Sequence, residues 1–259
     1  MGINRTINMI RNTSNWMQYL LYKSGGKKNP TFTYNLRNKF KVTVPRVIQP
    51  EFKELFFEEI YVKHLPKELI SIDGPVVIDI GANVGFFSIF SLFKFMNPRV
   101  ISFEPIKRNF KLLHENIKLA NQSKLTVINK AVNDTIGELV LKFNSSQDIT
   151  TSASLFDNQY GSDEETVYTT TLEATMQEYS LSKIDLLKLD CEGAEYNIIY
   201  NTPRAFFDKV NCMSMETHIG KAENENNTSL LNYIKGLGFT TITERNSFIW
   251  AYKEPSIWK

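Results

Sequence analysis

From residue 75 onward, the spacing of apolar residues switches repeatedly between a strand period and a helix period. Val76–Ile80 is an apolar, mostly β-branched run that predicts a strand covered on both faces. Further strands are predicted at 100–103, 125–128, 184–189 and 210–215, helices at 86–95, 107–120, 194–200 and 226–237, and a closing hairpin from 240–243 and 248–252. Strands that alternate with helices predict an α/β fold with a doubly wound, mostly parallel sheet.

The N-terminal part lies outside this alternation. Residues 3–23 mix apolar and basic side chains and predict a helix, which the glycine- and lysine-rich residues 24–31 interrupt. Residues 32–66 predict a short extended piece and a helix. We therefore expect an N-terminal helical extension, residues 1–66, before an α/β domain, residues 67–259. Packing of helix 3–23 on its own domain is favoured over contact with an anionic membrane surface.

A second departure from the alternation spans residues 137–179. Strands are predicted at 138–143 and 167–171, and a helix from Leu172. Between them, residues 144–165 are rich in Ser, Asp, Thr and Asn. A loop of this length in a compact domain is usually a lid or a disordered segment, and the sequence leaves both open.

Composition narrows the class of protein. The chain has 259 residues, with 30 Lys plus Arg against 28 Asp plus Glu, so charge gives no argument for a nucleic-acid partner. Its two cysteines, Cys191 and Cys212, make no disulfide framework, which favours reduced thiols and a cytoplasmic location. We expect neither a transmembrane segment nor a signal peptide. The oligomeric state is left open.

The first predicted strand leads into the loop Gly81-Ala82-Asn83-Val84-Gly85 and then into a helix. In an open α/β sheet, ligands bind beyond the carboxyl ends of the strands, where the winding reverses. Glu104 ends the second strand, at the spacing where an acidic residue binds a ribose diol. The pattern predicts a nucleoside-containing cofactor.

The residues around the glycines favour adenosylmethionine over a dinucleotide. Ala82 and Asn83 stand where a dinucleotide loop needs a glycine so that the backbone can approach the pyrophosphate. Asp79 would repel a pyrophosphate, whereas adenosylmethionine carries a sulfonium and an ammonium and has no phosphate. The helix N–H groups after Gly85 can still bind its carboxylate.

Five motifs in order resemble the FkbM family of methyltransferases over roughly residues 75–252. They are DIGANVG at 79–85, SFEP at 102–105, NKAV at 129–132, KLDCEGAE at 188–195 and METH at 215–218. The resemblance implies a class I methyltransferase domain with a Rossmann-like, seven-stranded sheet whose last strand is antiparallel. It implies adenosylmethionine as cofactor and O-methylation of a hydroxyl, often on a sugar or a natural product.

The resemblance also implies roles for single residues. Gly81, Asn83 and Gly85 would shape the methionine end of the cofactor site, and Glu104 would bind the ribose hydroxyls. Asn129 and Ala131, at the end of the third strand, would border the adenine. With Asp79 and Ala82 from the argument above, these residues form the predicted cofactor site.

The predicted acceptor side lies at the ends of the fourth and fifth strands. Lys188, Asp190 and Glu192 alternate along the fourth strand and its exit, so they share a face. A buried lysine or aspartate is costly unless it is paired or used. Glu216 and His218 share a face at the end of the fifth strand. We therefore predict Lys188, Asp190, Glu216 and His218 as the catalytic residues.

Two ways of activating an acceptor hydroxyl are open. His218 has the ordinary pKa of a base near neutrality, with Glu216 or Asp190 to orient it. Alternatively, Asp190, Glu216 and His218 hold one Mg²⁺ or Mn²⁺ that polarises the hydroxyl. The base is favoured because the cluster has few ligands. Glu195 begins a helix, where a carboxylate is favourable without any function, so its role stays open.

Two other functions compete with a small-molecule or glycan O-methyltransferase. One is a nicotinamide-dependent oxidoreductase on a similar sheet, which Asp79 opposes. The other is a non-catalytic nucleoside-binding module, which Lys188, Asp190 and His218 oppose. No Asn-Pro-Pro or Asp-Pro-Pro pattern follows the fourth strand, and by family comparison this argues against methylation of nucleic-acid amines.

Overall fold

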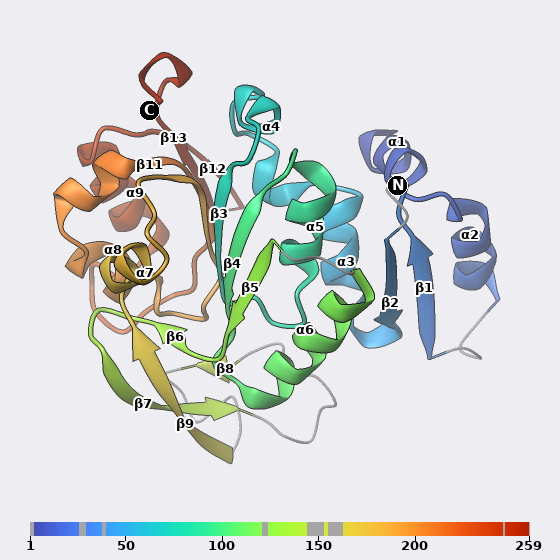
Figure 1. The fold of residues 1–259 in the computed structure, drawn as a ribbon, viewed down its shortest axis with the longest axis horizontal. Coiled ribbons are helices and arrows are strands. Elements are labelled where there is room, and N and C mark those ends of the chain that lie inside the picture. Colours follow the sequence, from blue (N-terminus) through green and yellow to red (C-terminus); the bar gives the residue numbers. More distant parts are fainter. Residues whose placement is uncertain are drawn as a thin grey trace.

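The computed structural model describes residues 3–25, 30–37, 40–120, 124–143, 153–154, 163–245 and 247–258. Its centre is a seven-stranded sheet in the order β12-β13-β11-β10-β3-β4-β5 (Figure 1). The strands are β3 (Val76–Ile80), β4 (Arg99–Phe103), β5 (Leu125–Ile128), β10 (Ile184–Leu189), β11 (Val210–Glu216), β12 (Thr240–Glu244) and β13 (Phe248–Tyr252). The doubly wound α/β fold predicted from the sequence is confirmed.

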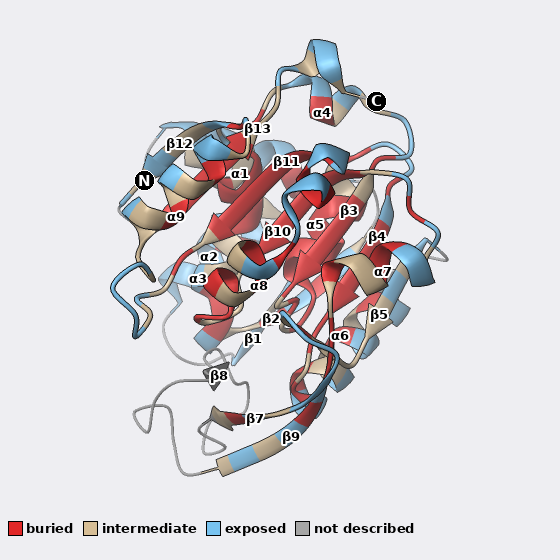
Figure 2. Ribbon diagram, turned by 90° about the vertical axis from the view of Figure 1, so that its left-hand side faces the viewer, coloured by how far each residue is buried: buried red, intermediate tan, exposed pale blue. Residues whose placement is uncertain are grey.

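Six of these strands run in the same direction, and β13 runs antiparallel to both of its neighbours, β11 and β12. All six residues of β10 are buried, as expected for a strand with helices on both faces (Figure 2). Because the parallel strands end at one edge, the loops after β3, β4, β10 and β11 meet there.

Helices cover both faces of the sheet (Figure 1). One face carries α3 (Gln49–Phe56), α5 (Phe86–Lys94) and α6 (Lys107–Ala120), and the other carries α7 (Leu172–Glu178), α8 (Glu195–Asn201) and α9 (Asn227–Gly236). Phe52 and Phe56 of α3 stack at a ring-centroid distance of 4.4 Å, and Phe56 meets Phe90 of α5 edge-on at 5.5 Å. This aromatic packing joins the N-terminal part to the sheet.

The N-terminal segment differs from the single predicted helix. Two helices form, α1 (Ile3–Asn12) and α2 (Trp16–Ser24), followed by a hairpin of β1 (Thr31–Asn35) and β2 (Lys41–Pro45). The interruption has a tertiary cause, because the Asn15 side chain donates to the Thr33 carbonyl and accepts from the Asn35 N–H. The short α4 (Glu68–Ser71) leads into β3.

A second sheet of order β6-β9-β7-β8 lies beyond the edge of the main sheet (Figure 1). It consists of β6 (Ala131–Val132), β7 (Gly137–Phe143), β8 (Ala153–Ser154) and β9 (Asp163–Thr170). Residues 163–165, expected in a loop, begin β9 because they pair with the end of β7. The prediction of a lid falls mostly on residues 144–152 and 155–162, which lie outside the described residues.

Both cysteines are free thiols, and Cys212 is buried. Within the described ranges, no helix combines the length and the apolar character needed to cross a bilayer.

Candidate active site

The loop after β3 follows a path set by its own backbone. The N–H groups of Gly81 and Ala82 both donate to the Phe103 carbonyl, at 3.1 and 2.9 Å. Gly81 has φ +74°, and an added Cβ would lie 1.8 Å from the Asp190 carbonyl oxygen. Only glycine fits at so close an approach of two chain segments. Asn83 adopts φ +49°, in the left-handed region that asparagine tolerates better than most residues.

Glu104, at the end of β4, braces this loop. Its side chain accepts the Asn83 N–H at 2.8 Å and the Ile106 N–H at 2.9 Å, one on each oxygen. Burial raises the pKa of Glu104 to about 7, although both N–H groups lower it. A carboxylate oxygen can accept two hydrogen bonds, so Glu104 retains two acceptor positions for a ligand.

A cleft of about 740 Å³ opens beside Glu104, and we call it the first cleft. Gly81, Asn83, Glu104 and Ala131, all predicted for the cofactor site, line it. Its apolar wall includes side chains from the loop after β4 and from the second sheet, namely Ile106, Val132, Leu139 and Leu141. Asn109, which the sequence interpretation left out, also lines it.

Other predicted cofactor residues shape the site without lining the first cleft. The Asn129 amide donates to the carbonyls of Glu104 and Pro105, at 2.9 and 2.8 Å, so it holds the loop after β4. Gly85, with φ +88°, is the residue before α5. Ala82 faces the opposite side of the loop, towards a second cleft.

Asp79 lies away from the position predicted for it. It is fully buried, and its Oδ1 pairs with Lys188 Nζ at 3.1 Å. Lys188 also donates to the carbonyls of Ile80 and Gly81. Burial lowers the pKa of Lys188, but the charges of Asp79 and Asp190 outweigh this and leave it raised. The pair thus fastens β10 to the glycine loop, and Asp79 lines neither cleft.

The second cleft encloses about 600 Å³ on the other side of the glycine loop. It shares Gly81, Asn83 and Asp190 with the first cleft. Its other polar residues are Lys188, Glu216 and three from the N-terminal part, Glu51, Glu54 and Tyr61. The Tyr61 hydroxyl donates to Asp190 Oδ2 at 2.8 Å. Asp190 therefore stands where the two clefts meet.

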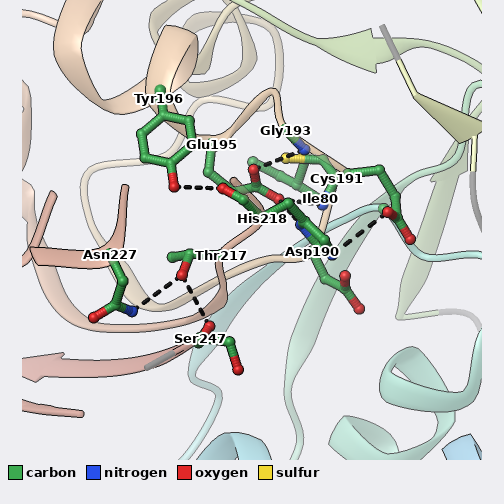
Figure 3. Close-up of polar contacts among 12 residues, drawn as sticks. Ile80, Asp190, Cys191, Gly193, Glu195, Tyr196, Thr217, His218, Asn227 and Ser247 are labelled. Carbon is green, nitrogen blue, oxygen red and sulfur yellow. Dashed lines mark hydrogen bonds and ion pairs between the residues drawn. The ribbon is translucent and has the colours of Figure 1, made fainter. Parts of the chain in front are cut away.

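His218 lies among carboxylates at the end of β11 (Figure 3). Its Nδ1 is 3.1 Å from Glu195 Oε1, and its Nε2 is 3.4 Å from Glu192 Oε2. Burial lowers the pKa of His218, but the hydrogen bond with Glu195 and the charges of Glu195 and Glu192 raise it to about 9. A carboxylate that orients His218 was predicted, but the carboxylate that binds its Nδ1 is Glu195 rather than Glu216 or Asp190.

Glu216, the last residue of β11, points into the second cleft. Burial and the charge of Asp190 raise the pKa of Glu216 to about 7 against the opposing effect of His218. Asp190, Glu216 and His218 were predicted to converge, but they do not form a single group. Asp190 stands between Glu216 on one side and the group of Glu192 and His218 on the other.

The model of the protein family described as Methyltransferase FkbM domain matches residues 79–241 of this sequence. These residues contain the glycine loop, Glu104 and the carboxylates around His218. The chain belongs to the FkbM methyltransferase family. It is an adenosylmethionine-dependent methyltransferase, so the oxidoreductase and the non-catalytic binding module are set aside.

Three proteins similar to this FkbM methyltransferase share 13–25% sequence identity with it. Methyltransferase sdnD of Sordaria araneosa is 25% identical over 195 residues, covering 64% of this chain and 73% of its own length. AMB antimetabolite synthetase AmbE of Pseudomonas aeruginosa is 24% identical over 200 residues, or 64% of this chain and 9% of its own. The crystal structure of Methyltransferase FkbM from Methylobacillus flagellatus KT has a TM-score of 0.49 and 13% identity, covering 76% of this chain and 50% of that one.

The residues of the first cleft fit the family's cofactor. Glu104 offers two acceptor positions to a ribose diol, and apolar side chains such as Ile106 and Val132 face the same space. Gly81 brings the backbone to the junction of the two clefts, beside Asp190, without a side chain in the way.

The sequence did not predict Tyr61 as a site residue, and it left the role of Glu195 open. The KLDCEGAE motif contains Glu195, but a carboxylate at the first turn of a helix needs no function, so its contact with His218 could not be inferred. Tyr61 comes from a segment with no recognisable motif, and no signal in the sequence could have found it.

Proposed function

We propose that this FkbM methyltransferase transfers a methyl group to a hydroxyl of a sugar, a glycan or a small natural product. The observation that carries the proposal is the junction at Asp190. There, a cleft suited to adenosine meets a second cleft that carries carboxylates. The match to part of an antimetabolite synthetase is consistent with a small acceptor.

The second cleft is suited to a ligand rich in hydrogen-bond donors. Glu51, Glu54 and Glu216 line it together with Tyr61. Glu51 Oε2 is buried and accepts no hydrogen bond from the described residues. A buried acceptor without a donor is costly, and the hydroxyls of a polyol would satisfy it. We therefore place the acceptor beside Asp190, extending into the second cleft.

Adenosylmethionine supplies a methyl group already activated by its sulfonium, so the protein mainly has to align the acceptor and remove its proton. As the acceptor oxygen bonds to the methyl carbon, the carbon–sulfur bond breaks and the hydroxyl proton passes to a base. We propose Glu216 as that base, because a carboxyl with a pKa of about 7 can accept protons at neutral pH. His218, with a pKa of about 9, is mostly protonated there.

We also propose a division of the chain into a methyltransferase domain of residues 67–259 and an N-terminal extension of residues 1–66. The extension supplies one wall of the second cleft through Glu51, Glu54 and Tyr61. A cytoplasmic location is proposed as well, supported by the two free thiols.

The test is transfer of a labelled methyl group from adenosylmethionine to a panel of sugars, glycans and hydroxylated small molecules, with amines and RNA as competing acceptors. The proposal expects label on oxygen in at least one hydroxyl acceptor and a large loss of rate in Glu216→Gln. Label only on amines or RNA would refute it. Cofactor binding is measured separately, as thermal stabilisation by adenosylhomocysteine but not by NAD.

A further inference from the structure

Three side chains that can donate electron pairs to a metal ion converge at the ends of β10 and β11. Asp190 and Glu192 follow β10, and His218 follows β11. One ligand atom from each lies within 4.8 Å of the others. Ligands around one divalent cation lie about 3 Å apart when the bonds are about 2.0–2.2 Å. The separations between the half-buried ligand atoms must therefore shorten by up to about 2 Å.

Glu195 fixes the orientation of the histidine. It is fully buried and accepts the N–H groups of Cys191 and Gly193 at 3.0 and 2.9 Å, so its carboxylate is held on two sides. His218 Nδ1 lies 3.1 Å from the same carboxylate (Figure 3). A carboxylate that binds one ring nitrogen and directs the other outward is the usual arrangement behind a metal-bound histidine.

The outward nitrogen, Nε2, lies 3.4 Å from Glu192 Oε2, where the two form an ion pair when the ring is protonated. An imidazole binds a metal in its neutral form, so a metal ion would take the place of that proton. Lys188 Nζ lies 3.8 Å from Asp190 Oδ2, but its shorter contacts are with Asp79 at 3.1 Å and with two carbonyls.

We propose that Asp190, Glu192 and His218 bind one divalent metal ion, with Glu195 as a positioning residue. One imidazole nitrogen and two carboxylate oxygens suit Mn²⁺, which accepts both kinds of ligand. Three protein ligands leave positions open on the ion. Beside the junction of the two clefts, an open position would bind the acceptor hydroxyl and favour its deprotonation. This use of the ion rests on the proposed O-methylation, whereas the binding site itself does not.

The binding test uses chelator-treated full-length protein without cofactor or acceptor. Mn²⁺ titration, followed by the electron paramagnetic resonance signal of the free ion, is expected to find one site per chain. Glu192→Gln and His218→Asn should each weaken it about tenfold or more, as lost ligands do. Glu223→Gln, which removes an exposed carboxylate from the loop after β11, is the matched control and should bind like wild type.

A measurement on the unaltered protein guards against variants that misfold. The chain has three histidines, so ring-labelled protein gives three histidine signals in NMR spectra. Diamagnetic Zn²⁺ should shift the His218 signal and leave His64 and His114 in place. A wild-type protein that binds no Mn²⁺, or a Zn²⁺ titration that leaves His218 unmoved, overturns the metal site. Methyl transfer measured in the same chelator-treated protein would then show that the proposed function stands without it.

Discussion

Glu104→Ala is expected to weaken adenosylhomocysteine binding at least tenfold. After its bonds to the Asn83 and Ile106 N–H groups, the carboxylate retains two acceptor positions, which we assign to the ribose hydroxyls. Hydrogen bonds to a charged group contribute about 1.5–3 kcal/mol each, so losing one alone reduces affinity roughly tenfold or more. Isothermal titration calorimetry at pH 8 measures the loss. Glu115→Gln, an exposed carboxylate on α6, is the control.

The same residue predicts how cofactor binding depends on pH. The pKa of Glu104 is raised to about 7 in the free protein, mainly by burial. If the ribose binds the ionised form, affinity for adenosylhomocysteine should fall roughly tenfold from pH 8 to pH 6, where only about a tenth of Glu104 is ionised. Glu104→Gln should bind more weakly than wild type at pH 8 and lose this dependence.

Stability supplies an independent measurement of the same pKa. Because the folded pKa lies above the unfolded value of 4.5, Glu104 stabilises the fold at low pH, and the contribution is lost as pH rises from 4.5 through 7. A shift of this size corresponds to roughly 3 kcal/mol. Urea denaturation at pH 5 and pH 8 should show that Glu104→Gln loses less unfolding free energy between these two pH values than wild type does.

The ribose assignment itself depends on the binding measurement. If Glu104→Ala binds adenosylhomocysteine as tightly as wild type at both pH 8 and pH 6, the assignment is refuted.

Three further predictions concern the supports of the site. Lys188→Met leaves a buried carboxylate without its ion-pair partner and should cost about 3–5 kcal/mol in urea denaturation; a loss below 1 kcal/mol would contradict the pairing. Gly81→Ala should lower the thermal midpoint and abolish adenosylhomocysteine binding, whereas Gly236→Ala, with nothing within 4 Å of the added Cβ, should bind normally. In metal-free protein, Glu195→Gln should lower the pKa of His218 from about 9, and an unchanged NMR titration would exclude their contact.

The strands and the cofactor loop could be predicted because each depends on neighbouring residues. Val76–Ile80 and Ile184–Leu189 have the composition of strands buried on both faces, and the structure has them with the predicted bounds. Glu104 could be placed beside the glycine loop because the spacing between successive strand ends is regular in this fold.

The roles of other site residues depend on register and tertiary contact, which sequence periodicity does not contain. Asp79 was expected to face the cofactor, but β3 and β10 pair so that Asp79 lies beside Lys188. Glu195 reaches His218 because the turn after β10 passes through Glu192 and Gly193, both with positive φ. Neither the pairing of strands 109 positions apart nor the direction of that turn follows from a local pattern.

The second cleft has walls of two different origins. Its floor comes from the glycine loop and the strand ends, inside the stretch that matches the family, residues 79–241. Its outer wall comes from α3 and Tyr61, which precede that stretch and are tied to the sheet where Trp250 donates to the Ile60 carbonyl. If the acceptor binds in this cleft, some of the residues that contact it are encoded before the family domain, whereas the residues around the methyl donor are encoded within that domain. Acceptor choice can then diverge by mutation in the N-terminal part while the methyl-donor half stays under constraint.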